Sequence, residues 1–208
     1  MRIVGVICEY NPLHTGHRYH LEQARTGADA VIAVMSGDFV QRGEPAVCDK
    51  YARAEMALRA GADAVIELPP VYSTGSAEVF ARGGIQLLNA CGCIDELCFG
   101  AECGQLESLR RAAALSADEA FGSRLREALR RGQSFAAACA EAAESLDPEA
   151  AALLSGPNNI LAVEYLKALE ATGSRIEARA VRRRGASYGE KDLPDKGFAS
   201  AAAVRKAL

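Results

Sequence analysis

Short apolar runs alternate with amphipathic segments along most of the chain. The apolar runs are bounded by polar and turn residues, which is typical of strands buried on both faces of a sheet. They predict strands at residues 3–8, 30–35, 64–66, 96–99 and 177–181. Apolar positions at helical spacing predict helices over residues 16–25, 50–59, 76–89 and 158–171. Because strands and helices alternate at βαβ spacing, we predict an α/β fold with a doubly wound parallel sheet.

Residues 105–154 show helical patterns only. These predict helices at 106–115, 118–131 and 134–146, with Asp147-Pro148 as a break. We therefore expect an all-helical insertion packed on an edge of the sheet. The predicted organisation is an α/β core over 1–104, a helical insertion over 105–155, and a return to the core over 156–208. That last part holds a polar loop (182–197) and a final helix (199–208).

Two residues mark the ends of the helix predicted over 50–59. Asp49 is a candidate N-cap, since its carboxylate can accept from the first free N–H groups, and Gly61 is a candidate C-cap. Ala52, Met56 and Ala57 give this segment its helical spacing.

Composition and charge narrow the class of protein. Half of the 208 residues are hydrophobic and a quarter are charged, which allows a sizeable core and disfavours disorder. The net charge of −3 excludes a globally basic nucleic-acid-binding protein, although the C-terminal part from Arg179 onward is basic. Since no apolar run approaches the ~20 residues of a membrane span and no signal peptide is recognisable, we expect a cytoplasmic protein with no membrane partner.

Seven scattered cysteines do not form a recognisable metal or disulfide pattern. Cys91 and Cys93 are closer together than the cysteines of a zinc knuckle, and the number is odd. We therefore predict reduced, buried thiols and no metal site.

Candidate chemistry follows the first predicted strand. Ligands of open parallel sheets bind beyond the carboxyl ends of the strands, and here that segment contains His14-x-Gly16-His17. Neither a dinucleotide-binding glycine motif nor a P-loop occurs. Gly16 allows close approach of the backbone to a phosphate, and two imidazoles at a helix start can donate to phosphate oxygens. Such donors stabilise the charge that develops during attack at the α-phosphorus of a nucleotide.

This motif resembles that of the nucleotidyltransferase superfamily, which includes class I aminoacyl-tRNA synthetases and small-molecule adenylyltransferases. Longer strings resemble the bacterial tRNA(Met) cytidine acetate ligase family over most of the chain, least so in the helical insertion. They are EYNP at 9–12, HRYHL at 17–21, VMSGDFVQRGEPA at 34–46, VIELP at 65–69, CFGAE at 98–102 and PNNIL at 157–161.

The resemblance implies a two-step reaction. Acetate attacks the α-phosphorus of ATP, and the acetyl group then passes from acetyl-adenylate to the wobble cytidine of elongator tRNA(Met). It implies ATP and Mg²⁺ as cofactors, and ATP, acetate and elongator tRNA(Met) as partners. The implied catalytic residues are His14, Gly16 and His17. The implied ATP-binding residues are Ile7, Cys8, Glu9, Tyr10, Asn11, His20, Gly100, Ala101, Asn159, Arg183, Arg184, Ser200 and Arg205.

One position departs from the superfamily pattern. The second signature, Ser-x-Thr-x-x-Arg, corresponds to Ser200 through Arg205, but Ala202 stands in place of the Thr. The change removes one hydroxyl that would bind phosphate. A small-molecule adenylyltransferase and a nucleotide-binding module without turnover therefore remain as alternative functions, and the oligomeric state stays open.

Several side chains allow a second interpretation. The three histidines, His20 included, could bind zinc from one helix face, although i,i+3 spacing hardly directs three ligands to one ion. Glu9 and Asp38 could position Mg²⁺ or the ribose, or could be helix-cap or loop residues.

The basic residues near the second strand are also ambiguous. Arg42, Lys50 and Arg53 are candidates for pyrophosphate or acetate contact, because a small carboxylate needs a cationic or N–H partner. An exposed helix face explains Lys50 and Arg53 equally well. Glu67 is expected to stabilise a turn.

Overall fold

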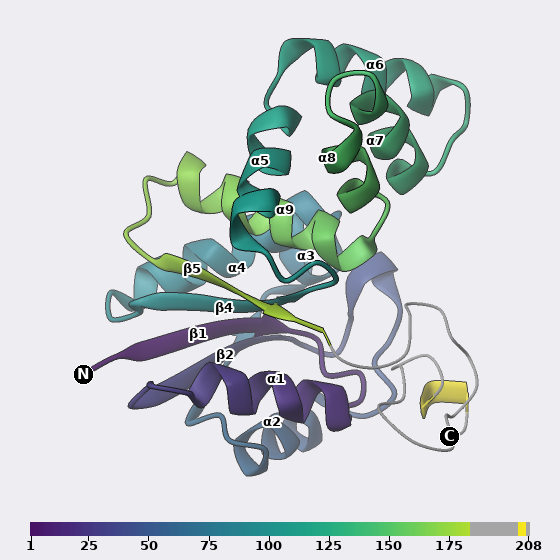
Figure 1. Ribbon diagram of the computed structural model, residues 1–208. Helices are drawn as coiled ribbons and strands as arrows, with labels where there is room; N and C mark the ends of the chain where they lie inside the picture. Colours follow the sequence, from purple (N-terminus) through teal and green to yellow (C-terminus); the bar gives the residue numbers. More distant parts are fainter. Residues whose placement is uncertain (184–203, 207–208) are drawn as a thin grey trace.

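A single parallel sheet organises the chain (Figure 1). The computed structural model describes residues 1–183 and 204–206. Five strands lie in the order β3-β2-β1-β4-β5, and every neighbouring pair is parallel. Their bounds are β1 (Ile3–Cys8), β2 (Ala30–Ser36), β3 (Ala64–Leu68), β4 (Glu96–Ala101) and β5 (Glu177–Arg182). All five predicted strands are present, so the predicted fold class is confirmed.

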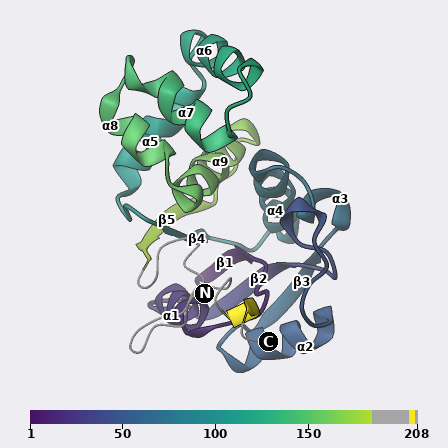
Figure 2. The same ribbon diagram turned by 90° about the vertical axis from the view of Figure 1, so that its right-hand side faces the viewer.

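Helices cover both faces of the sheet. The helices α1 (Thr15–Arg25) and α2 (Lys50–Arg59) lie on one face, and α4 (Ala77–Cys91) and α9 (Pro157–Ala171) lie on the other (Figures 1 and 2). Side chains of β1 alternate between two cores accordingly. Val4 and Val6 belong to the core beneath α1, whereas Ile3 belongs to the core beneath α4.

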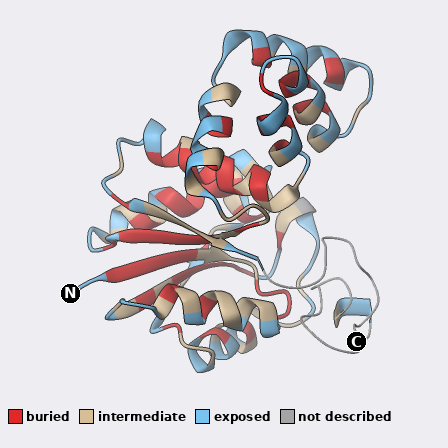
Figure 3. Cartoon of the chain, in the orientation of Figure 1, coloured by how far each residue is buried: buried red, intermediate tan, exposed pale blue. Residues whose placement is uncertain are grey.

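The helical segment is supported by α9. It comprises α5 (Leu106–Ser116), α6 (Glu119–Arg130), α7 (Phe135–Glu144) and α8 (Pro148–Leu154). Buried residues of this segment, such as Leu109, Phe121 and Leu154, are continuous with the core shared by α4 and α9. Figure 3 shows the buried side of these helices turned inward and the outer surface of α6 exposed. Helix α5 contacts the edge strand β5, and α5 and α8 contact α9, while α6 packs on α5 and α7, and α7 packs on α8.

Some local expectations differ from the structure. The helices α3 (Pro70–Ser73) and α8 and the 3-10 helix η1 (Gln41–Gly43) were not predicted. Asp147-Pro148 is indeed a break, but Asp147 also caps α8 by accepting from Glu149 and Ala150. Helix α2 has its C-cap at Ala60 rather than Gly61. The predicted loop and final helix lie mostly outside the described residues, although 204–206 are helical.

Membrane insertion finds no support in the described residues. Within 1–183 and 204–206, none of the helices combines the length and the apolarity that crossing a bilayer requires.

A buried arginine connects the ends of two strands. Arg53 on α2 is 0% exposed, so both expectations for it, an exposed helix face and a contact with substrate, are wrong. Its guanidinium donates to four main-chain carbonyl oxygens: those of Glu9 (2.7 Å), Ser36 (3.0 Å), Cys48 (3.1 Å) and Gly37. Hydrogen bonds to charged groups contribute about 1.5–3 kcal/mol each, which offsets the cost of burying the cation. Met56, one of the residues that give α2 its helical spacing, is 39% exposed.

Two glycines let α4 approach α3 and the sheet closely. A Cβ on Gly83 would lie 2.3–2.6 Å from Tyr72, and a Cβ on Gly84 would lie 2.6 Å from Ile7 Cδ1. The absence of these two side chains therefore sets the distance between α4 and its neighbours. Gly122 on α6 is different, because a Cβ there would meet only the end of the flexible Arg126 side chain, at 3.4 Å.

This contrast yields a paired stability prediction. We expect Gly83→Ala to lower the free energy of unfolding by about 1–3 kcal/mol, because overpacking outweighs the better helix propensity of alanine. The matched control, Gly122→Ala, should raise the free energy by about 0.5–1 kcal/mol. Urea unfolding followed by circular dichroism measures both. A stabilised Gly83→Ala variant would contradict the close packing of α4.

Candidate functional site

The segment between β1 and α1 is tightly held at the carboxyl end of the sheet. Tyr10 has a φ of 46°, in the left-handed region, and its side chain is only 1% exposed. A non-glycine residue keeps this conformation only where its surroundings compensate, and here the ring lies in the core beneath α1. Asn11 is buried too, and its Oδ1 accepts from the N–H of Val47 at 2.8 Å. The side chains of Tyr10 and Asn11 therefore hold the backbone that leads to His14 in place.

Two histidines form the N-terminal cap of α1. His14 is the N-cap residue, and its Nδ1 accepts from the N–H of Gly16 at 3.1 Å. The N–H of His14 in turn points to His17 Nδ1 at 3.4 Å, so the pair makes a reciprocal capping box. The two rings stack with centroids 3.7 Å apart. A Cβ on Gly16 would lie 2.9 Å from the His14 ring, so Gly16 leaves room for that ring.

The capping box fixes which nitrogen of His14 can donate. Because Nδ1 accepts a backbone hydrogen, the proton of the neutral ring resides on Nε2. Burial lowers the pKa of His14 to about 4, and the charges of Arg183 and Arg205 act in the same direction. At neutral pH the ring is therefore uncharged and offers one N–H to a ligand.

The other two histidines are uncharged for the same main reason. Burial holds the pKa of His17 well below its usual range, helped by His14, Arg183 and His20 and opposed by a hydrogen bond to the Pro12 carbonyl. Burial likewise lowers the pKa of His20 to about 4. His20 Nε2 lies 3.6 Å from the Cys98 thiol, deeper in the fold.

Two arginines from distant parts of the chain join this cluster. The N–H of Arg183 donates to the Ala101 carbonyl at 2.9 Å, and the stem of the side chain lies beside Gly100, where a Cβ would be 3.3 Å from Arg183 Cγ. Arg205 Nη1 donates to the Asn11 carbonyl at 2.9 Å. The ends of β1 and β4 and residues 204–206 therefore meet at one place, which Figure 2 views from the carboxyl side of the sheet.

Asn159 lies at the start of α9 in a closed setting. It is 4% exposed, its Oδ1 accepts from the N–H of Cys103 (3.2 Å), and its Nδ2 donates to the Leu153 carbonyl (3.1 Å). The Glu102 carboxylate accepts from the N–H groups of Asn158 (3.0 Å) and Asn159 (2.6 Å). This carboxylate occupies the helix end where a phosphate would otherwise bind.

The remaining predicted residues are placed as follows. The Ile7 side chain packs against α4 at Gly84, and Cys8 Sγ points to the Val34 carbonyl at 3.6 Å. Arg184 and Ser200 lie outside the described residues, as does the side chain of Arg42.

The acidic residues near β2 are engaged with the backbone and with Lys50. Glu9 Oε1 accepts from the N–H of Gln41 at 2.8 Å, and Asp38 Oδ1 accepts from the N–H of Lys50 at 3.1 Å. Lys50 Nζ binds both oxygens of Glu67 at 2.8–2.9 Å, and this contact raises the pKa of the lysine. Glu67 thus joins β3 to α2 instead of stabilising a turn.

Sequence reasoning missed the role of Arg53. The available signal was its spacing of four residues from Ala57, which puts both on the buried face of α2.

For metals, among residues 1–183 and 204–206 no group of three histidine, cysteine or acidic side chains is arranged to hold an ion.

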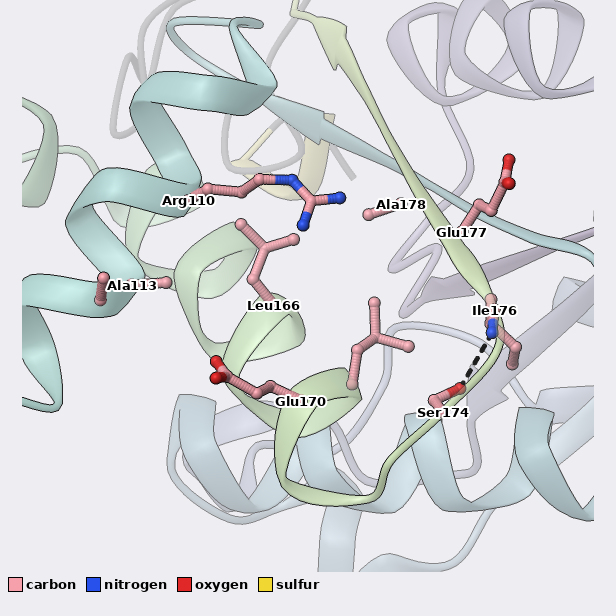
Figure 4. Close-up of a pocket in the computed structure, with 10 residues that line it drawn as sticks. Arg110, Ala113, Leu166, Glu170, Ser174, Ile176, Glu177 and Ala178 are labelled. Atoms are coloured by element: carbon pink, nitrogen blue, oxygen red, sulfur yellow. Dashed lines mark hydrogen bonds between the residues drawn. The ribbon is translucent and has the colours of Figure 1, made fainter.

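A separate groove lies away from the histidines. It has a volume of about 660 Å³ and lies between α5, α9 and the beginning of β5 (Figure 4). Leu166, Leu169 and Ile176 contribute apolar surface, and Arg110 and Glu177 are among its polar residues. Since β5 begins at Glu177, the groove lies at the amino end of that strand, whereas the histidines lie at the carboxyl ends.

The fold and the histidine cluster together define an α/β nucleotidyltransferase with a His-x-Gly-His motif. A family profile described as HIGH Nucleotidyl Transferase matches residues 1–208. The chain belongs to this family.

Curated relatives agree with the resemblance inferred from the motifs. The tRNA(Met) cytidine acetate ligase of Syntrophotalea carbinolica is 49% identical over 214 residues, which cover 100% of this chain and 51% of that protein. The protein of the same name from Caldanaerobacter subterraneus subsp. tengcongensis is 48% identical, with 100% and 53% covered. The chain spans about half the length of the curated relatives it matches.

Solved structures of Thermotoga maritima TmcAL show the same fold. The apo structure aligns with a TM-score of 0.89 at 41% identity, covering 99% of this chain and 51% of that one. A second structure, bound with alpha-thio ATP, aligns with a TM-score of 0.85 at 41% identity, covering 99% and 50%.

The lowered histidine pKa values predict a pH dependence of stability. The unfolded chain binds protons near pH 6.5, whereas folded His14 binds one only near pH 4. The unfolded state is therefore favoured progressively as the pH falls from about 6.5 to about 4, and stability is fully present above that window.

We expect the free energy of unfolding to fall across this window, and the fall to be smaller in His14→Asn. Urea unfolding at several pH values measures it. An NMR titration of His14 with a midpoint near 6.5 would contradict the buried, neutral ring.

Proposed function

We propose that this chain binds ATP at the histidine cluster and catalyses the adenylation of acetate for tRNA(Met) cytidine acetylation. The observation that carries the proposal is the convergence of neutral histidine N–H donors with Arg183 and Arg205 at the ends of β1 and β4. Relatives named tRNA(Met) cytidine acetate ligase, and a relative bound with alpha-thio ATP, support it.

In the first step an acetate oxygen attacks the α-phosphorus of ATP. The new P–O bond forms as the bond to the bridging oxygen breaks, and pyrophosphate leaves with that electron pair. Negative charge accumulates on the α-phosphate oxygens and on the leaving group. His14 donates to these oxygens through Nε2, and His17 donates to them once its N–H exchanges the Pro12 carbonyl for a phosphate oxygen. Arg183 and Arg205 attract the remaining phosphate charge. Preorganised donors of this kind make a covalent enzyme nucleophile unnecessary.

In the second step the exocyclic amine of the wobble cytidine attacks the carbonyl carbon of acetyl-adenylate. AMP leaves, and the amine loses a proton to give N4-acetylcytidine. The same donors would stabilise the departing AMP phosphate. The basic residues that follow Arg179 would face the tRNA backbone.

Mg²⁺ fits this site as a partner of the ATP phosphates. Glu9 and Asp38 are carboxylates near the carboxyl ends of β1 and β2, where each accepts a backbone N–H. Carboxylate oxygens are the ligands that Mg²⁺ or its bound waters prefer. When bound, Mg²⁺ would neutralise charge on the leaving pyrophosphate.

The first test is pyrophosphate release from ATP and Mg²⁺, with and without acetate and in the absence of tRNA. We expect acetate-dependent release. ATP binding without release would favour a nucleotide-binding module, and release that depends on a different acceptor would favour a small-molecule adenylyltransferase. Transfer of labelled acetate to elongator tRNA(Met) tests the second step.

Substitution of His17 tests the role of the histidines. We expect His17→Ala to slow acetate-dependent pyrophosphate release by about 10²–10³-fold, the usual loss for one transition-state donor. Arg59→Ala is the control. It removes an exposed side chain from the last turn of α2 and should retain full activity. A loss below threefold in His17→Ala would remove His17 from the chemistry.

Substitution of His14 separates catalysis from helix capping. Asparagine is a favourable N-cap residue, so His14→Asn keeps the cap but loses the Nε2 donor. We expect a comparable loss of rate at nearly unchanged stability, whereas His14→Ala should also lose about 1 kcal/mol of unfolding free energy. Full activity in His14→Asn would show that His14 only caps the helix.

A further inference from the structure

Arg53 lies directly beneath the segment that carries the histidines. Its guanidinium reaches the carbonyl of Glu9, the first residue after β1, and the carbonyls of Ser36 and Gly37 at the end of β2. Its Nε donates to the Cys48 carbonyl just before α2. One planar group therefore connects three separate segments at the carboxyl edge of the sheet.

The acceptors of Arg53 are main-chain atoms. Among residues 1–183 and 204–206 the structure shows no ion pair between Arg53 and a carboxylate. A guanidinium presents five N–H donors in a rigid fork, so four carbonyls can be held in a defined arrangement at once. What the side chain fixes is thus the path of the backbone.

That path leads straight to the site. Glu9 precedes Tyr10, whose backbone is in the left-handed region, and the chain then runs through the buried Asn11 to the N-cap residue His14. Val47, in the segment just before Cys48, donates to the Asn11 side chain. A shift of the Glu9 carbonyl would therefore move the histidine rings relative to Arg183 and Arg205.

We propose that Arg53 is a positioning residue, which sets the β1–α1 segment so that His14 and His17 face the reacting phosphate. The inference rests on the proposed function and deepens it. Arg53 is buried and acts only through the backbone of the β1–α1 segment, so it does not touch the substrate.

Lysine cannot replace this group. Arg53→Lys keeps the positive charge, but a single nitrogen with three protons cannot reach all four carbonyls. We expect kcat for acetate-dependent pyrophosphate release, per folded molecule, to fall about 10–100-fold, because misplacement of catalytic groups by about 1 Å has effects of this size. The KM for ATP should change far less, since Arg183 and Arg205 still attract the phosphates.

Arg179 supplies the matched control. It is also an arginine that binds main-chain carbonyls, those of Gln23 and Ala24, together with the Glu96 carboxylate, although 29% of its side chain is exposed. These contacts lie at the end of α1 and the start of β4, away from the carboxyl edge of the sheet. Arg179→Lys should lose stability to a similar degree and keep kcat per folded molecule.

A second readout does not depend on turnover. In Arg53→Lys the capping box should loosen, so the NMR titration midpoint of His14 should rise from about 4 toward the ordinary value. Arg179→Lys should leave that midpoint unchanged. If the wild-type chain shows no acetate-dependent release, the proposed function fails, and this titration still decides the role of Arg53.

Folding failure is covered by a third variant. Arg53→Gln keeps a side-chain amide that can donate to some of the four carbonyls, so this variant is measured if Arg53→Lys does not fold. An unchanged kcat per folded molecule together with an unchanged His14 midpoint, in either folded variant, would overturn the proposal. Equal losses of kcat in the Arg53 and Arg179 variants would also overturn it.

Discussion

The guanidinium of Arg53 is the contact on which the architecture of the site depends. Parallel strands bring their carboxyl ends to one edge, but this alone does not determine how the chain leaves that edge. Four carbonyl oxygens converge on Arg53, and they belong to the exits of β1 and β2 and to the entry of α2. Because the cation is fully buried, water cannot replace any of these partners, and the exits are held together as a unit.

A second constraint turns this frame into a chemical site. His14 and His17 use Nδ1 to cap α1, so helix formation and donor orientation arise from the same hydrogen bonds. Burial and the nearby arginines keep the rings neutral, which leaves the positive charge to Arg183 and Arg205. Neutral directional donors beside cationic side chains suit a phosphate whose charge changes during reaction. The α9 end, by contrast, is already occupied by Glu102.

Much of the fold could be predicted from the sequence, and the exceptions have physical causes. Apolar runs mark β1, β2 and β4 because these inner strands of the parallel sheet are mostly buried, and Asp49 is predictable as a cap because its carboxylate accepts from the nearby Ala52 N–H. The role of Arg53 was misjudged because most of its partners are backbone carbonyls of two segments distant in sequence, at Glu9 and at Ser36-Gly37, and a residue pattern does not record such contacts. Helix α8 was missed because seven residues are too few to show a period. The burial of Asn159 depends on Cys103 and Leu153, contacts that only the folded chain creates.

The central claim is that the α-phosphate of ATP lies against the capping histidines. A crystal structure of the chain with a non-hydrolysable ATP analogue tests it most directly. The account predicts α-phosphate oxygens about 2.7–3.1 Å from Nε2 of His14 and His17, with Arg183 or Arg205 on the outer phosphates. Phosphates bound elsewhere, for instance at the groove between α5, α9 and β5, with both histidine Nε2 atoms facing only solvent or protein, would contradict it.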